Sequence, residues 1–169
     1  MEITLVPYVE INGAWTASDN VMSEIYAELL NDGTADTVFY DGRISDQFEF
    51  IEMMKNPTNL PVIVMTGNDI SGIAWINSIS DNRAFAHFAF FKKVWGKTEE
   101  LGQKILSYWL AIPKSNGYLL DVIMGLVPAF NERAHKYVER IGFKRLGEIP
   151  HLVNVHGNRE PGVIFYYAR

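Results

Sequence analysis

The sequence predicts an α/β domain with a central mixed, mostly antiparallel sheet of about seven strands and about four flanking helices. Three observations support this fold class. Several segments have apolar residues at the spacing of one helical face, and three apolar strands follow one another with only short turns between them. Further along, a helix lies between two apolar strands, and such a crossover unit makes its two strands parallel.

The N-terminal region is predicted to form a strand and a helix. Residues 3–9, ITLVPYV, have the apolar and β-branched composition of a strand. Thr16 or Ser18 can cap a helix over about 19–30, and Gly33 stops it. The apolar residues of this helix share one face: Met22, Ile25, Tyr26 and Leu29.

A loop and a second helix follow. Residues 31–43, NDGTADTVFYDGR, contain Asp-Gly turn signals and are predicted to form a loop. Ser45 is the expected N-cap of a helix over about 46–55. Pro57 prevents this helix from continuing, because proline cannot donate the backbone hydrogen bond and clashes with the preceding turn.

Three strands, a helix and a fourth strand come next. The strands cover 61–66, 70–78 and 83–91, and the short turns between them imply an antiparallel meander. The helix covers about 98–112 and leads into the apolar strand 118–127. Strands 83–91 and 118–127 should therefore run parallel to each other.

The C-terminal region is predicted to form a helix and two strands. The segment NERAHKYVERIGF gives a helix over 131–141, with Asn131 as N-cap and Gly142 as a left-handed stop. Strands over 143–153 and 163–168 close the chain, with a polar loop between them.

Composition restricts the classes of protein and site. The 169 residues carry a net charge of −5 and a sequence pI of about 5.3, which argues against a nucleic-acid-binding protein. The chain contains no Cys, which excludes a thiolate metal site and a cysteine nucleophile, and its His residues lack the spacing of metal ligands. The N-terminal residues do not have the pattern of a secretory signal, and no apolar run could span a membrane. We therefore expect one cytoplasmic domain over 1–169 that binds neither a metal nor a membrane.

Two turns are the expected ligand sites. In open α/β sheets, ligands bind beyond the carboxyl ends of the parallel strands, which here points to 92–98 and 128–131. Each turn opens a helix, whose free N–H groups attract anions. The first turn also carries Lys92, Lys93 and Lys97, although lysines on a surface turn are common without any ligand.

This arrangement resembles the GNAT superfamily of acyl-CoA-dependent N-acyltransferases over about residues 60–168. The segment KVWGKT resembles the family's pyrophosphate loop, Q/R-x-x-G-x-G/A, with Lys93 in place of Gln or Arg, Gly96 at the first glycine and Thr98 at the last position. The resemblance implies a single acetyltransferase domain. Its two parallel strands would pair near their starts and then diverge, with acetyl-CoA in the gap between them.

The resemblance also assigns contacts to the cofactor. The backbone at Phe90 and Phe91 would line the pantetheine arm of acetyl-CoA. Residues 93–98, which include Trp95 and Lys97, would hold the pyrophosphate at the start of the following helix.

The same loop departs from the family pattern. Thr98 is expected to cap the following helix with its hydroxyl, but Glu99 and Glu100 place two negative charges on the first turn, where they repel a pyrophosphate. The alternative function is therefore a GNAT-fold binding or interaction module that has lost catalysis.

A second motif resembles the family's late helix, N-x-x-A followed later by G-F. Asn131, Ala134, Gly142 and Phe143 match this pattern at the right intervals. Helix capping and core packing explain the same residues without any ligand. We expect Asn131 to cap its helix and to contact the cofactor.

His87 and Tyr137 are the candidate catalytic residues. His87 lies on a strand that should border the gap, where a neutral imidazole could accept a proton from an amine. Tyr137 could protonate the departing thiolate, but the family's tyrosine falls at Val138, about 100° further round the helix. Each residue also has a structural explanation: His87 could be a sheet histidine, and Tyr137 could be a core tyrosine. For Tyr137 we expect the structural role and not the catalytic one.

The resemblance implies transfer of an acetyl group from acetyl-CoA to a primary amine by direct attack in a ternary complex. The acceptor would be a small molecule or a peptide in a groove between 31–43 and 154–161, whose mixed charges do not identify it. The resemblance also allows a homodimer.

Overall fold

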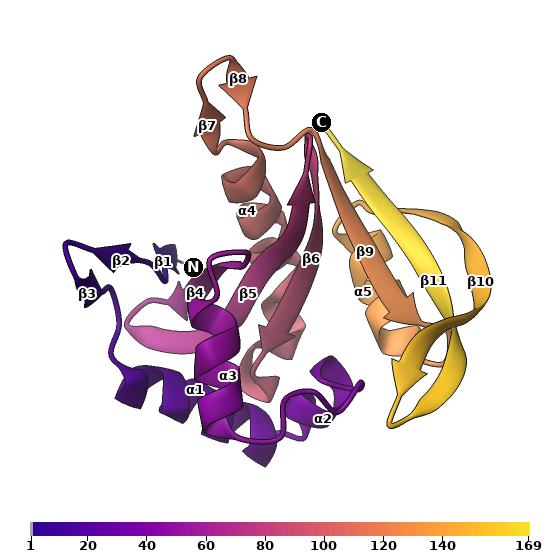
Figure 1. Cartoon of the computed structure of the whole chain (residues 1–169), viewed down its shortest axis with the longest axis horizontal. Coiled ribbons are helices and arrows are strands. Elements are labelled where there is room, and N and C mark those ends of the chain that lie inside the picture. Colours follow the sequence, from indigo (N-terminus) through magenta and orange to yellow (C-terminus); the bar gives the residue numbers. More distant parts are fainter. Residues whose placement is uncertain (1) are drawn as a thin grey trace.

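A computed structural model describes residues 2–169 as a seven-stranded sheet with helices on both faces (Figure 1). The strand order is β1-β4-β5-β6-β9-β11-β10, and every neighbouring pair is antiparallel except β6 and β9, which are parallel. These strands are β1 (Ile3–Pro7), β4 (Leu60–Thr66), β5 (Asp69–Ser80), β6 (Arg83–Phe90), β9 (Val122–Pro128), β10 (Lys144–Val155) and β11 (Asn158–Ala168). The predicted fold class is confirmed, including its one parallel pair.

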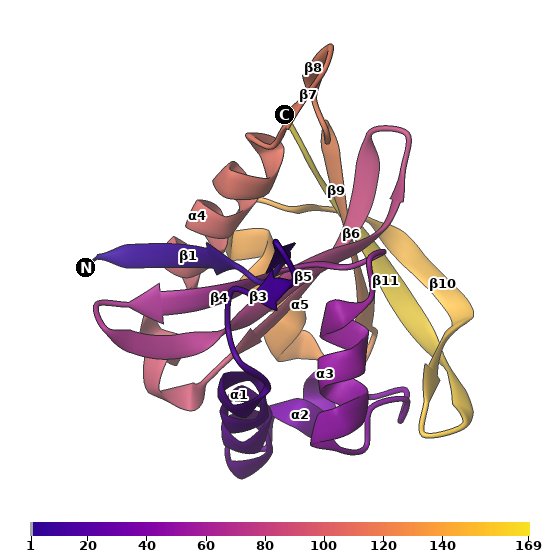
Figure 2. The same cartoon turned by 60° about the vertical axis from the view of Figure 1, so that its left-hand side comes forward.

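Helices cover both faces of this sheet (Figure 2). Within residues 2–169 they are α1 (Asp19–Asn31), α2 (Thr34–Val38), α3 (Gln47–Lys55), the 3₁₀-helix η1 (Lys92–Lys97), α4 (Thr98–Leu110) and α5 (Glu132–Arg140). Side chains alternate between the faces of a strand, so each face has its own core. Ile63 and Trp75 pack against α1, α2 and α3, whereas Val64 and Ala74 belong to the core under α4 and α5. Within residues 2–169 no helix is long and apolar enough to cross a membrane.

The parallel strands β6 and β9 separate soon after they begin. Their ladder pairs only 83–85 with 122–124, whereas β9 stays paired with β11 along its whole length, 122–128. Figure 1 shows β6 and β9 together at their starts and apart at their ends. The predicted divergence is confirmed, and it leaves the ends of the two strands free to border a ligand.

Several predicted elements need correction. The loop predicted over 31–43 contains α2, which begins where Gly33 takes a left-handed conformation with φ of 68°. The strand predicted over 118–127 begins only at Val122, because Gly117–Tyr118 (β8) forms a small hairpin with Pro113–Lys114 (β7). The prediction also missed a hairpin between Glu10–Ile11 (β2) and Ala14–Trp15 (β3), which turns through Asn12 and Gly13, both with positive φ. The last two strands are longer than predicted and leave only a short turn between them.

The helix caps were predicted with mixed success. Ser18 caps α1 and Asn131 caps α5, both as expected. The cap of α3 is Asp46, whose carboxylate accepts two backbone N–H groups, while Ser45 instead donates to Glu49. The prediction for Thr98 was also wrong, as its hydroxyl donates to a carbonyl oxygen in the preceding 3₁₀ turn.

Candidate functional site

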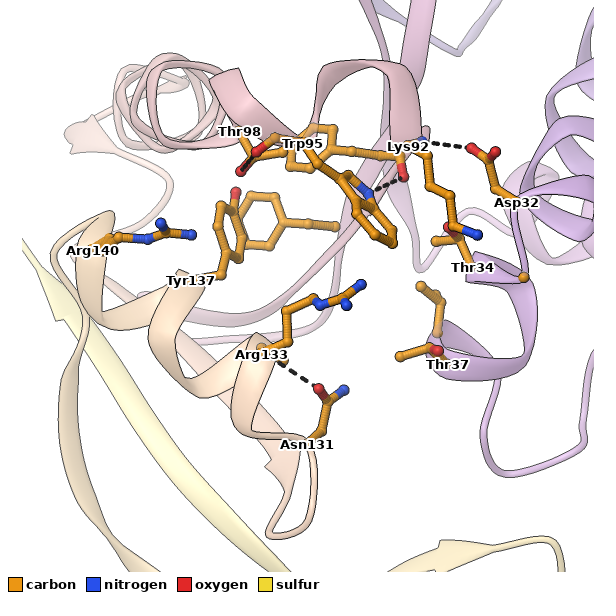
Figure 3. A pocket seen from close by; sticks show the side chains of 15 residues that line it. Asp32, Thr34, Thr37, Lys92, Trp95, Thr98, Asn131, Arg133, Tyr137 and Arg140 are labelled. Atoms are coloured by element: carbon orange, nitrogen blue, oxygen red, sulfur yellow. Dashed lines mark hydrogen bonds between the residues drawn. The ribbon is translucent and has the colours of Figure 1, made fainter.

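A cavity of about 810 Å³ opens between α2, η1, α4 and α5, beside the ends of the diverging strands (Figure 3). A second cavity of about 140 Å³ shares Phe88, Asn131 and Tyr137 with it and extends between β6 and β9. The larger cavity is lined by Asp32, Gly33, Thr34, Thr37, Val38, Phe88, Phe90, Lys92, Trp95, Thr98, Asn131, Arg133, Ala134, Tyr137 and Arg140. Three parts of the chain that are far apart in sequence, within 32–38, 88–98 and 131–140, therefore build a single site.

The inner wall of the cavity is aromatic. The Tyr137 ring lies edge-on to Phe88 and Phe90, with ring centres 5.6 and 6.0 Å apart. This geometry is favourable because the positive edge of one ring meets the negative face of another. Such a wall suits an apolar or flexible chain, whereas a charged group would lose its hydration against it.

Trp95 stands at the mouth of the cavity and joins its two sides. Its indole N–H donates to the Phe90 carbonyl oxygen at 3.3 Å, which ties η1 to the end of β6. The Arg133 guanidinium from α5 lies 4.3 Å from the Trp95 ring centre, and the Lys92 ammonium lies 5.6 Å from it. The indole therefore holds two cations close together at the entrance.

The lining of the cavity is positively charged although the whole chain has a net charge of −5. Three cationic side chains line it, those of Lys92, Arg133 and Arg140, and none of them forms an ion pair with a carboxylate among the described residues. The one acidic residue in the lining, Asp32, accepts the backbone N–H of Lys92 at 2.5 Å. A cluster of unpaired cations in an acidic protein indicates an anionic ligand.

Two hydroxyl groups in the cavity lining lack hydrogen-bond partners. Thr34 Oγ1 and Tyr137 Oη are buried, and neither finds a partner within residues 2–169. Burial raises the pKa of the Tyr137 hydroxyl above its usual value, so the group stays protonated and can donate. Buried polar groups nearly always have partners, so these two hydroxyls indicate a ligand that would supply them.

Comparison with solved structures identifies the fold. A spermidine N-acetyltransferase from Vibrio cholerae, solved in complex with CoA and spermine, matches with a TM-score of 0.70 and 16% identity over 97% of this chain and 95% of that one. The microcin C7 self-immunity acetyltransferase MccE, solved with acetyl-CoA and AMP, matches with a TM-score of 0.71 and 12% identity. The match covers 99% of this chain and 93% of MccE. The chain has the GNAT fold. No protein-family model and no curated protein matches its sequence.

The GNAT fold brings both sequence motifs to the cavity. The KVWGKT segment forms η1 and the start of α4, and Trp95 and Thr98 from this segment line the cavity. The second motif opens α5, and its Asn131 lines both cavities while its side-chain oxygen accepts the Ala134 N–H at 3.1 Å. Gly142 ends α5 with a φ of 106°, as the motif predicted.

Four of the predicted cofactor contacts lie outside the cavity lining. Phe91 is buried in the core under α1–α3, and the Lys93 ammonium lies 5.5 Å from the Phe91 ring centre. Gly96 and Lys97 are exposed on the outer side of η1. Within η1, the 3₁₀ conformation turns the side chains of Lys93 and Lys97 away from the cavity, because consecutive side chains of a helix point in different directions.

The prediction also missed cavity residues that the GNAT fold supplies from α5 and α2. From α5 the missed residues are Arg133 and Arg140, which lie four residues before and three after the predicted Tyr137, so the three share one face of the helix. This spacing was available in the sequence and could have identified both arginines. Thr34 and Thr37 could not be found in this way, because the helix that presents them was predicted to be a loop.

His87 lines the smaller cavity from β6. Its ring stacks on Trp75 with centres 4.8 Å apart, and its Nε2 lies 3.2 Å from Asn77 Oδ1. An acceptor at Asn77 requires the hydrogen on Nε2, which leaves Nδ1 as the free lone pair. Burial lowers the pKa of His87 to about 4, and the Asp41 carboxylate opposes this shift. The imidazole is therefore neutral at pH 7 and a weak base.

Proposed function

We propose that this chain is an N-acetyltransferase that transfers the acetyl group of acetyl-CoA to a primary amine. The observation that carries the proposal is the cavity, because it joins an apolar gap between two parallel strands to a lining that carries three unpaired cations. Acetyl-CoA has the matching chemistry, with a long flexible arm and a nucleotide that carries several phosphate charges. The CoA and acetyl-CoA complexes of the two similar structures support the same choice of ligand.

The pantetheine arm is assigned to the gap between β6 and β9. Beyond Phe85 and Met124 the facing edges of these strands no longer pair, so their backbone groups are free to bond the amides of the arm. Phe88 and Phe90 supply the apolar wall beside it. Asn131 can cap α5 with its oxygen and still present its side-chain NH₂ to the ligand.

The phosphates are assigned to the part of the cavity lined by cationic side chains and the start of α4. Lys92 and the two arginines of α5 supply charge there, and the N-terminus of α4 supplies free backbone N–H groups. Glu99 and Glu100, which motivated the inactive alternative, do not line the cavity. Their repulsion of a phosphate is therefore weaker than the sequence indicated, since both carboxylates are exposed and screened.

The proposed reaction needs positioning more than covalent chemistry. The amine nitrogen forms a bond with the acetyl carbon, the carbon–sulfur bond breaks, and sulfur leaves with the electron pair and takes up the proton that the amine loses. The neutral His87 faces the smaller cavity, where it can orient the amine or pass its proton to water. The protonated Tyr137 hydroxyl can donate a hydrogen bond to the donor ligand.

Two measurements test this proposal. CoA should raise the midpoint of thermal unfolding, since a ligand at 100 times its Kd adds about 2.7 kcal/mol to the free energy of unfolding. Acetyl-CoA and a panel of primary amines should release free thiol, which a thiol reagent detects without background because the chain has no Cys. No stabilisation by millimolar CoA, together with no thiol release for any amine, would favour the inactive binding module.

A further inference from the structure

One half of the sheet has an apolar face that no described helix covers. The register aligns Asn77, Phe85, Met124, Tyr166 and Lys144 as a straight row across β5, β6, β9, β11 and β10. The three central side chains are only partly buried, and none of them belongs to either core. His87, two residues from Phe85 on β6, pairs with Trp75, which belongs to the core under α1–α3. This face therefore lies on the same side of the sheet as that core, and the core under α4 and α5 lies on the opposite side.

A second row lies next to the first and is interrupted by the gap. On one side of the gap this row ends at His87 of β6. On the other side it consists of Leu126 of β9 and its partner Ile164 of β11. Leu126 and Ile164 are also partly exposed and lie outside both cores. Ile149, on the edge strand, is paired with Gly162 and is 43% exposed, so the apolar surface extends to the end of the sheet.

This apolar face is continuous with the proposed reaction centre. His87 and Leu126 both line the smaller cavity, which extends from the larger cavity into the gap. The cations at the mouth come from η1 and α5, on the other face of the sheet. A donor held by those cations and a second reactant held on the apolar face would therefore meet between β6 and β9.

The charges of this face discriminate between classes of amine. Neither row contains an acidic side chain, and the basic Lys144 stands at the end of the first row. Glu160 lies on the same face of β11, four residues from Ile164 and outside both rows. The Asp41 carboxylate near His87 is paired with Arg43 at 3.4 Å. A polycationic amine would find no free carboxylate along these rows, whereas an apolar body would bury surface against Met124, Leu126 and Ile164.

We propose that the acyl acceptor is a primary amine on an apolar or aromatic body, which lies across Met124, Leu126, Ile164 and Tyr166. Its nitrogen enters the gap between His87 and Leu126. This inference rests on the proposed acetyltransferase function and names its acceptor class. A second copy of the chain fits less well, because β10 carries two irregularities, at 145–147 and 149–153, that disturb edge-to-edge strand pairing.

The test compares two amines of similar length, 2-phenylethylamine and 1,4-diaminobutane, in the thiol-release assay with acetyl-CoA. The aromatic amine should have a kcat/KM higher by about tenfold or more. Ile164→Asp should lower that value by about tenfold or more and leave CoA affinity unchanged in calorimetry, because Ile164 faces away from the cations. Leu126→Gln should act in the same direction, and Phe48→Asp, at a 70% exposed position of α3, is the control expected to change neither value.

Three results would overturn the inference while the proposed function stands: a preference for the diamine, no effect of Ile164→Asp or Leu126→Gln on the aromatic amine, or CoA binding without transfer to the aromatic amine. A dimer that Ile164→Asp dissociates, with unchanged acceptor kinetics, would assign the face to a second copy and also overturn it. If the wild-type chain neither binds CoA nor acetylates either amine, the proposed function itself fails.

Discussion

The guanidinium carbon of Arg133 lies 4.3 Å from the centre of the Trp95 indole ring, so α5 and η1 meet across the mouth of the cavity. Trp95 also donates to the Phe90 carbonyl oxygen at the end of β6. The end of β6, η1 and α5 are thus connected through the Trp95 side chain. In our account the same guanidinium then binds a phosphate of the donor.

Replacing Arg133 is predicted to weaken CoA binding strongly and to lower the free energy of unfolding only slightly. Arg133→Ala should raise the Kd for CoA by about tenfold or more, because a charge-assisted hydrogen bond contributes about 1.5–3 kcal/mol. The free energy of unfolding should fall by only about 0.5–1 kcal/mol, the value of an exposed cation–π contact. Calorimetry and urea unfolding measure the two effects. Arg145→Ala is the matched control, since Arg145 pairs with Glu148 on β10 and does not line the cavity. An equal loss of affinity in both variants would contradict the phosphate site.

The side-chain oxygen of Asn131 caps α5, and its side-chain NH₂ is predicted to bind the ligand. Asn131→Ala should cost about 1 kcal/mol of stability through the lost cap and should also weaken CoA binding. Asn131→Asp keeps a capping oxygen but adds negative charge toward the phosphates, so it should weaken CoA binding while stability stays near wild type. Thermal unfolding and calorimetry on both variants test this separation. If Asn131→Asp binds CoA as the wild type does, the residue is only a cap.

Gly102 and Tyr137 should behave as a coupled pair. A Cβ atom at Gly102 would overlap Tyr137 Oη and approach Ile141 Cγ2 to 2.9 Å, so Gly102→Ala should destabilise the chain by about 1–3 kcal/mol despite the better helix propensity of alanine. Tyr137→Phe removes a hydroxyl that has no partner in the described chain, so by itself it should cost little stability. The double variant should recover part of the loss. A purely additive double-mutant cycle would show that the two groups do not touch.

The same Tyr137→Phe variant tests for general acid catalysis. The hydroxyl lies against Gly102 of α4, near the phosphate end of the cavity, so we expect a higher KM for acetyl-CoA and an unchanged kcat. General acid catalysis is typically worth about 10²–10⁴-fold in rate. A drop in kcat of that size would make Tyr137 the acid after all.

His87 should make stability depend on pH. Folding lowers its pKa from 6.5 to about 4, so the unfolded chain holds this proton more tightly. The stabilisation by the neutral ring is complete above pH 6.5 and is lost as the pH falls toward 4, by an amount on the order of 3 kcal/mol. His87→Phe should flatten the urea-unfolding profile between these pH values. His151→Phe, at an exposed position, should leave the slope as it is in the wild type.

Much of the fold could be predicted because its long elements bury one continuous stripe or face. The helix predicted over 19–30 is Asp19–Asn31, and the one predicted over 98–112 is Thr98–Leu110. The short α2 could not be predicted, since a five-residue helix presents too little of the repeat to detect. Its position is fixed by Gly33 and by Ala35, which is buried in the core under α1–α3.

The candidate site was predicted less completely than the fold. Phe90, Trp95, Thr98, Asn131 and Tyr137 were expected and do line the cavity. The loop lysines were expected to hold the phosphate, but only Lys92 lines the cavity, because the direction of each side chain depends on the 3₁₀ geometry of η1. Which cations surround a cavity is a property of several packed elements, which the spacing within one segment cannot reveal.

A crystal structure of the chain with acetyl-CoA tests the central claim most directly. We predict that the pantetheine arm lies between β6 and β9 beyond Phe85 and Met124, with the phosphates in contact with Lys92, Arg133 and Arg140. Acetyl-CoA bound elsewhere, or an empty gap at millimolar acetyl-CoA, would contradict the proposed site and the function built on it.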